Sequence, residues 1–438
     1  MKLYRSELRN GIFYNHIETD RFKTGFLSLN FIMPLERNEV AANALLSNVL
    51  RRGCRAYPDQ AAIGRRLEEL YGADIVTRIS KRGESQIISF SADMLDDAYR
   101  LPQDNTDIFG GVADLLAKLL FDPLVDENGL FNPEYVETER LGRIDTVRAL
   151  VNNKRRYAIN RLTALMCAEE KNGISVEGTV EDYESFDPCA LKDAYRRFVS
   201  ETHIEVFYVG TRRREDVEPI LTDIFAKLTR AEGIKLPETE VIRVAQKRRD
   251  IEEQAPIVQG NLVVGFRTGT VITDVDYLAF PLFNEVYGGS PASKLFMNVR
   301  EKKSLCYYCS SFGDTVKGVM LVSAGIENKN RDEAVAEILL QLEKMKQGEI
   351  DEGELLCAKQ ALFNSYRTIA DNPAGLEAWY LGRVLAGRIE SPEEVTEKLQ
   401  AVGIADIAAL ARKVTLDTVY FLRGTLKEEN KGGDEDAE

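Results

Sequence analysis

The chain contains an internal repeat, in which both halves show the same order of predicted helices and strands. Residues 67–92 (LEELYGADIVTRISKRGESQIISFSA) align without a gap with residues 299–324 (VREKKSLCYYCSSFGDTVKGVMLVSA). Each segment reads as the end of a helix, a strand, a polar turn with Gly and a second strand that ends in Ser-Ala. This order predicts a helix followed by a β-hairpin in each half.

Further segments of the two halves match in the same order. The apolar strands FLSLNFIMP and NLVVGFRTG each precede an apolar-periodic helix, predicted over residues 40–52 and 276–287. Later, ALKDAYRRFVSETHIEVFYVG corresponds to DIAALARKVTLDTVYFLRG, a helix that leads into a strand ending at Gly210 or Gly424. A repeat unit of about two hundred residues is a domain and not a solenoid unit. The pattern predicts an α+β fold with helices on one face of each sheet.

The repeat suggests the domain boundaries. We expect an N-terminal domain over residues 1–230, a linker over 231–255 and a C-terminal domain over 256–426. The predicted linker is rich in charged residues and poor in apolar ones, which is typical of an exposed connection. Residues 427–438 are acidic and lack apolar anchors, so a solvated tail is expected.

Composition excludes several classes of partner. The net charge is −14 and no basic cluster with interleaved aromatic residues occurs, which argues against nucleic acid. No apolar run is long enough to span a bilayer, and the first residues lack the apolar core of a signal peptide. We therefore expect no membrane partner and a cytoplasmic location.

Histidine and cysteine bear on metal chemistry. The chain has two histidines, His16 in a stretch that resembles a turn and His203 at the start of a strand, so no helix carries a histidine pair. Both are expected to be ordinary surface or packing residues. Cys306 and Cys309 form a C-x-x-C, but residues three apart in a strand point to opposite faces. The six cysteines are therefore expected to be reduced thiols without redox or metal function.

The duplicated plan resembles the insulinase, pitrilysin and mitochondrial-processing-peptidase family over essentially the whole chain apart from the tail. Active members carry H-x-x-E-H on the first helix, in which two imidazoles hold zinc and the Glu activates water. The helix ends here in ALLSNVLRRG, and alignment on its Gly places Ala44, Ser47 and Asn48 at these positions. The family's later glutamate ligand corresponds to Thr146 in VETERLGRIDTVRALV. The resemblance implies degenerate zinc positions and no metal in this chain.

The second half is similar to the family's C-terminal motif. In VYGGSPASKLFMNVREKKSLCYY, Arg300 and Tyr307 match an Arg and a Tyr that face the zinc across the chamber in the family. A guanidinium and a phenol can hold a peptide carbonyl and stabilise developing negative charge. Gly288 and Gly289 resemble the substrate-contacting glycine loop of partner subunits, or form a simple tight turn. Ser290 and Pro291 are expected to start the helix behind them.

The resemblance implies two duplicated domains of the processing-peptidase (LuxS/MPP-like metallohydrolase) type that face each other as a clam. It also implies a degenerate bacterial subunit in a heterodimer, with zinc supplied by a peptidase homologue and a peptide as substrate. Under this hypothesis Arg300 and Tyr307 assist the partner's site, and no peptidase activity is expected of the chain alone. The alternative is a scaffold or interaction protein of the same fold without a proteolytic role.

Overall fold

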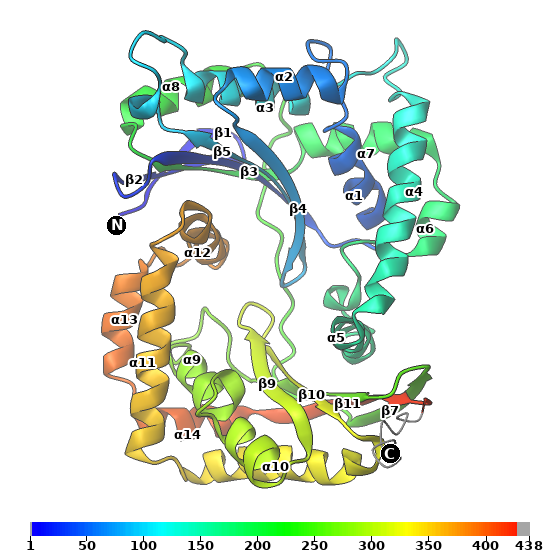
Figure 1. The fold of residues 1–438 in the computed structure, drawn as a ribbon, viewed down its shortest axis with the longest axis vertical. Helices are drawn as coiled ribbons and strands as arrows, with labels where there is room; N and C mark the ends of the chain where they lie inside the picture. The colour runs from blue at the N-terminus through cyan, green and yellow to red at the C-terminus, as the bar shows by residue number, and fades with distance from the viewer. Residues whose placement is uncertain (1, 427–438) are drawn as a thin grey trace, which may run out of the picture. The chain divides into compact units, whose positions relative to one another are not determined.

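Two mixed β-sheets with accompanying helices make up the fold (Figure 1). The computed structural model describes residues 2–426, and the predicted acidic tail lies outside them. The chain forms two units. Unit 1 contains Met1–Leu150, Cys167–Val241 and Phe363–Ala401, and unit 2 contains Val151–Met166, Ile242–Leu362 and Val402–Glu438. The α+β class is confirmed.

Unit 1 contains a six-stranded sheet in the order β1-β2-β6-β3-β5-β4. The β2/β6 pair is parallel and the other pairs are antiparallel. Successive residues of β3 point to opposite faces of the sheet. Leu27, Leu29 and Phe31 therefore enter the main core, whereas Phe26 joins a second cluster. The strands are β1 (Tyr4–Arg9), β2 (Ile12–Glu18), β3 (Thr24–Pro34), β4 (Asp74–Arg82), β5 (Ser85–Leu95) and β6 (His203–Gly210).

The helices of unit 1 pack against this sheet and each other. Their bounds are α1 (Val40–Val49), α2 (Gln60–Glu69), α3 (Ile108–Phe121), α4 (Pro133–Ala149), α6 (Val180–Glu184), α7 (Pro188–Ser200), α8 (Arg214–Ala226), α12 (Pro373–Leu385) and α13 (Pro392–Gln400). Short 3₁₀ turns occur in the chain at Asp97–Tyr99, Leu150–Asn152, Lys171–Gly173 and Asn328–Asn330. Within residues 2–426, no helix has the length and apolar character needed to cross a membrane.

Unit 2 contains a five-stranded sheet in the order β7-β11-β8-β10-β9. Its strands are β7 (Arg249–Ala255), β8 (Gly260–Arg267), β9 (Cys306–Asp314), β10 (Val319–Ile326) and β11 (Thr415–Gly424). Its helical segments are α5 (Lys154–Met166), α9 (Ala279–Asn284), the π-helical η4 (Glu285–Gly289) and η5 (Phe296–Lys302), α10 (Arg331–Gln347) and α14 (Ile404–Lys413). Helix α11 (Glu352–Ile369) has residues in both units.

The two sheets repeat one topology, which confirms the duplication. In each, a parallel pair (β2/β6 or β7/β11) is followed by an antiparallel strand (β3 or β8) and then by the predicted hairpin (β5/β4 or β10/β9). Residues 249–255 form β7 although they lie in the predicted linker. The helix predicted over residues 276–287 starts later, at Ala279, and its second part is π-helical.

Each half of the sequence contributes helical residues to the unit that is formed mainly by the other half. Helix α5 follows α4 in the chain but packs on β8, β10 and β11 of unit 2. A Cβ on Gly265 of β8 would lie 2.7 Å from Met166 Sδ and 3.0 Å from Leu162 Cδ2, so the glycine permits the close approach of α5. Conversely, α12 follows α11 but packs on β3 and β6 of unit 1. Each sheet is therefore completed by a helix from the opposite half of the sequence.

Helix α12 meets the first sheet through a buried carboxylate. Glu377 Oε1 accepts hydrogen bonds from Asn30 Nδ2 at 2.8 Å and from Ser28 Oγ at 3.0 Å. Burial raises the pKa of Glu377, while the two hydrogen bonds and the charges of Arg78 and Arg82 oppose the rise. The folded state therefore retains a proton above the pH at which an exposed glutamate loses it. Stability from this group is complete below the ordinary pKa and falls as pH rises through the raised one.

Glu377→Gln is expected to remove this pH dependence. Both hydrogen bonds end on one oxygen, which the amide retains, so the variant should gain stability relative to the parent as pH rises from 5 to 8. Trp379 lies on α12 and is the single tryptophan of the chain, so its fluorescence during urea unfolding reports on this helix. The exposed Glu397→Gln should show no such trend. If the stability of the parent and of Glu377→Gln changed with pH in the same way, the raised pKa of Glu377 would be contradicted.

Candidate functional site

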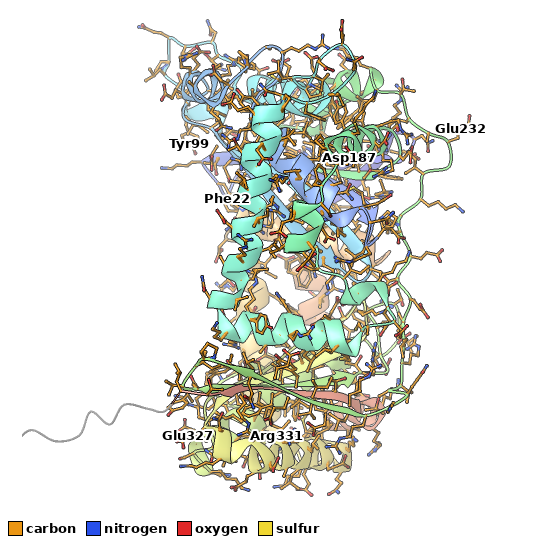
Figure 2. All side chains as sticks on the ribbon, turned by 90° about the vertical axis from the view of Figure 1, so that its right-hand side faces the viewer. Phe22, Tyr99, Asp187, Glu232, Glu327 and Arg331 are labelled. Carbon is orange, nitrogen blue, oxygen red and sulfur yellow. The ribbon has the colours of Figure 1, made fainter. Side chains whose placement is uncertain are left out.

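Arg300 and Tyr307 line one pocket of about 380 Å³ in unit 2. The pocket lies where η5 leads into β9, the edge strand of the second sheet. Glu327, which precedes α10, also lines it and is labelled with Arg331 in Figure 2. The remaining lining residues are Glu301, Ser304, Leu305, Cys306 and Asn330. The structure thus brings together the two residues that the sequence motif singled out.

The backbone between Arg300 and Tyr307 has an unusual conformation. Residues Phe296–Lys302 are π-helical, and beyond them the Leu305 amide donates to the Val299 carbonyl at 3.0 Å. π-Helical segments are rare and are frequent at functional sites. Ser304 follows with φ of 50°, in the left-handed region, which costs a residue with a Cβ about 1–3 kcal/mol. A π turn and a strained serine in the same pocket both indicate a functional site.

Both side chains leave hydrogen-bond donors available. The Arg300 guanidinium lies 4.6 Å from the centre of the Phe296 ring, and its Nε is 3.5 Å from Glu301 Oε1. Its side chain is still 41% exposed. Tyr307 is 56% exposed, and its hydroxyl makes no hydrogen bond within the part of the chain that the structure describes. A guanidinium and a phenol in this state can bind a carbonyl or carboxylate oxygen.

A β-bulge at Tyr307 changes the direction of the side chains in β9. Ile326 pairs with Cys306 and Gly325 with Tyr308, so Tyr307 is an extra residue without a partner in β10. The prediction that Cys306 and Cys309 point to opposite faces is therefore wrong. Both are buried. The neighbouring Cys309 thiol and the Arg300 charge lower the pKa of Cys306, whereas the Cys306 thiol and burial raise the pKa of Cys309 well above its ordinary value.

The glycine pair ends one helix and does not open the next. Gly288 and Gly289 are the last residues of η4, and Ser290 and Pro291 lie in a turn, so the expected N-cap at Ser290 is wrong. A Cβ on Gly288 would lie 2.8 Å from the backbone nitrogen of Ser311, so this glycine permits close packing on β9. Neither glycine lines the pocket with Arg300. Substrate contact by Gly288 and Gly289 stays a prediction.

The four positions that the sequence matched to zinc chemistry lie on α1 and α4, which pack against each other. Ala44 and Ser47 are buried, and Ser47 Oγ donates to the Ala44 carbonyl at 2.8 Å. Asn48 is partly buried, and Thr146 is exposed with its Oγ1 donating to the Gly142 carbonyl. A methyl, two hydroxyls that serve the helix backbone and an amide do not fit zinc, which prefers imidazole, thiolate and carboxylate ligands.

The two histidines are packing residues. His16 lies in β2 and not in a turn, and its Nδ1 is 2.5 Å from the Tyr14 hydroxyl. His203 begins β6 as predicted, and its Nε2 is 2.7 Å from Glu205 Oε1. Both are buried, and burial lowers the pKa of His16. Across residues 2–426, no group of three or more His, Cys, Asp or Glu side chains is arranged to hold a metal ion.

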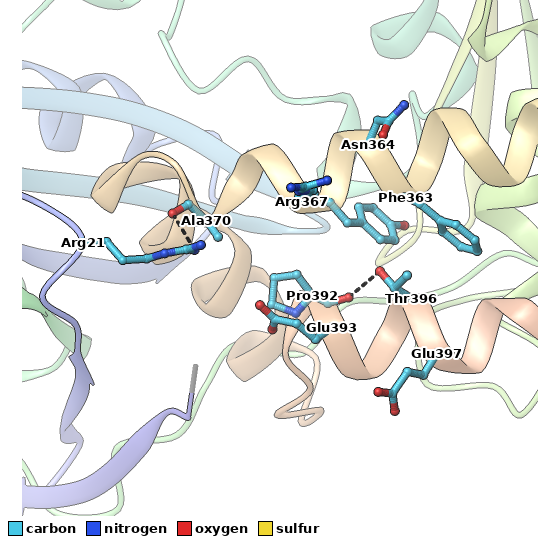
Figure 3. Close-up of a pocket in the computed structure, with 10 residues that line it drawn as sticks. Arg21, Phe363, Asn364, Arg367, Ala370, Pro392, Glu393, Thr396 and Glu397 are labelled. Carbon is cyan, nitrogen blue, oxygen red and sulfur yellow. Dashed lines mark hydrogen bonds between the residues drawn. The ribbon is translucent and has the colours of Figure 1, made fainter.

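A pocket of about 400 Å³ in unit 1 was not expected from the sequence (Figure 3). It brings Arg21 together with residues of α11 and α13, and Arg21 donates to the Ala370 carbonyl at 3.4 Å. Arg367 and Glu397 give its wall both signs of charge. Local sequence carries no signal for it, since its parts are more than three hundred positions apart.

The chain is similar to known proteins both in sequence and in structure. Residues 185–362 match the family model "Peptidase M16 inactive domain". "Probable inactive metalloprotease YmfF" of Bacillus subtilis is 32% identical over 96% of this chain and 99% of its own length. "Uncharacterized zinc protease YmxG" of the same organism is 25% identical over 69% of this chain and 71% of its own. The crystal structure of a conserved protein from Enterococcus faecalis V583 matches with a TM-score of 0.88 and 28% identity, over 98% of this chain and all of that one.

Proposed function

Because this chain belongs to the peptidase M16 family, as an inactive homologue of its metallopeptidases, we propose that it is the non-catalytic subunit of a heterodimeric zinc peptidase. In this role it contributes peptide binding and the Arg300–Tyr307 pair to a zinc-bearing partner chain. The observation that carries the proposal is the pocket in which these two side chains, both with free donors, lie beside a strained backbone.

The N-terminal half of the chain also supports a role in which the partner chain supplies the zinc site. Ala44 and Asn48 stand where the family has its two imidazoles, Ser47 where it has the general base, and Thr146 where it has the third ligand. None of these side chains can ionise a bound water, so zinc and the base must come from another chain. A zinc-bearing M16 relative is the partner that this deficit requires. Bacillus subtilis has both a relative named "Probable inactive metalloprotease" and one named "Uncharacterized zinc protease", which supports such a pairing.

Strand β9 offers a means of peptide binding. It is an edge strand, and Tyr307 within its bulge is exposed. An extended peptide can add to such an edge through backbone hydrogen bonds. A carbonyl of that peptide would then lie within reach of the Arg300 guanidinium and the Tyr307 hydroxyl, which would stabilise negative charge on its oxygen during cleavage.

A mixing experiment tests the proposal. The chain is combined with a zinc-bearing M16 relative from the same organism, and cleavage of a fluorogenic peptide library is measured for each chain alone and for the mixture. We expect no turnover by this chain alone and a rate for the mixture well above that of the relative alone. A tight complex with unchanged cleavage would refute the proposal and favour the scaffold alternative.

A further inference from the structure

We propose that Cys306 and Cys309 form an oxidisable dithiol, a modification site that reacts with small-molecule disulfides of the glutathione class and closes to an intramolecular disulfide. The inference does not depend on the proposed function. It is carried by the bulge in β9, which places the two thiols on one face of the sheet, and by the opening of one of them to the pocket.

The bulge creates the pair. In a regular strand the two side chains would lie on opposite faces, but the extra residue Tyr307 reverses the alternation between Cys306 and Tyr308. Cys306 and Cys309 therefore lie on the same face of the sheet, and each thiol shifts the pKa of the other. Without the bulge the C-x-x-C would hold two unrelated thiols.

The two thiols are not equivalent. Cys306 lines the pocket and faces the positive charge of Arg300, whereas Cys309 lies deeper and does not line the pocket. The neighbouring Cys309 thiol lowers the pKa of Cys306, which favours the thiolate at Cys306. A thiol of lowered pKa that lines a pocket, with a more deeply buried thiol beside it, has the arrangement of an attacking and a resolving cysteine.

The reaction proceeds in two exchange steps. The Cys306 thiolate attacks one sulfur of a disulfide RSSR, a new S–S bond forms, the old one breaks and RS⁻ leaves and takes up a proton. Cys309 then loses its proton to solvent and attacks Cys306 Sγ, and the second RS⁻ leaves and is protonated in turn. The protein loses two electrons and two protons, and RSSR is reduced to two RSH.

Closing the bond needs a small movement of the backbone. The sulfur atoms must approach to about 2.05 Å. Tyr307 has no partner in β10, and β9 is the edge strand of the sheet within residues 2–426, so a shift there disturbs few ladder hydrogen bonds. The adjustment should therefore occur within the folded protein.

Mass spectrometry tests the proposal on the full chain. Cys189 and Cys357 are exposed, so they are first replaced by serine to remove their own reaction with the oxidant. The reduced protein is treated with oxidised glutathione and digested with trypsin, which leaves both cysteines in the peptide of residues 304–317. We expect this peptide to lose two hydrogens and to regain them with dithiothreitol.

Single variants in the same background separate the two roles. Cys309→Ser should stop at the mixed disulfide and retain one glutathione on Cys306, whereas Cys306→Ser should react little, since Cys309 is buried. A peptide that stays reduced in the folded protein, or a wild-type site that stops at the mixed disulfide, would overturn the proposal. Circular dichroism of each variant confirms that the fold is retained.

Discussion

Replacing Arg300 by alanine is expected to lower peptide cleavage by the mixed peptidase by about 10²-fold or more, the usual effect of losing a donor that stabilises a developing oxyanion. The variant should still bind the partner, because the side chain is exposed in its pocket, where it contacts Phe296 and Glu301. The loss should therefore appear in kcat more than in the affinity of the two chains. Initial rates at saturating partner concentration, with affinity measured by calorimetry, check both parts.

Matched variants sharpen this prediction. Lys302→Ala removes a positive charge from the same π-helical segment, but Lys302 does not line the pocket, so the rate should change little. Tyr307→Phe removes one hydroxyl and keeps the ring, and should lower the rate in the same direction as Arg300→Ala. Equal effects of Arg300→Ala and Lys302→Ala would mean that net charge, and not a positioned donor, governs cleavage.

Replacing Asp417 by alanine is expected to destabilise unit 2 by about 3–5 kcal/mol, because it breaks a buried ion pair by removing the carboxylate that accepts from the Arg267 guanidinium. Arg267 is almost fully buried on β8, and its Nε donates to Asp417 Oδ2 at 2.9 Å. Asp417 is the extra residue of a bulge in β11, which directs its carboxylate to this partner. The same guanidinium donates to the carbonyl of Met166, the last residue of α5, so loss of Asp417 should also loosen that helix.

Hydrogen–deuterium exchange measures this effect locally, since two units need not unfold together. Peptides from β8 and α5 should exchange about 10²-fold faster or more in Asp417→Ala, while those from β3 in unit 1 keep their rates. Asp417→Asn keeps the shape of the side chain and an acceptor for Arg267, so it should lose less protection from exchange than Asp417→Ala. Unchanged protection of β8 in the alanine variant would show that the pair contributes little.

Local pattern in the sequence accounts for much of the fold. The hairpins β4/β5 and β9/β10 follow from two strand-like runs on either side of a polar turn with glycine, and the strands β3 and β8 from their apolar runs. The Arg300–Tyr307 pair also came from a local motif, and the structure places it in one pocket.

Features that depend on distant residues could not be predicted in this way. The exchange of α5 and α12 between the units is set by packing across the chain, and nothing in their own sequences names the sheet that they cover. Strand β7 is rich in charged residues, so its sequence resembles an exposed linker. In the structure it pairs with β11. The bulge at Tyr307 can be recognised only from the register between β9 and β10. Without that register, the sequence wrongly predicted that Cys306 and Cys309 point to opposite faces.

The zinc content of the purified chain tests the central claim most directly. After equilibration with zinc and dialysis, we expect far less than one ion per chain by elemental mass spectrometry and no peptide turnover that a chelator removes. The reason is that the α1 positions Ala44, Ser47 and Asn48 supply no metal ligand. One tightly held zinc per chain, together with peptide turnover that chelation abolishes, would contradict the account.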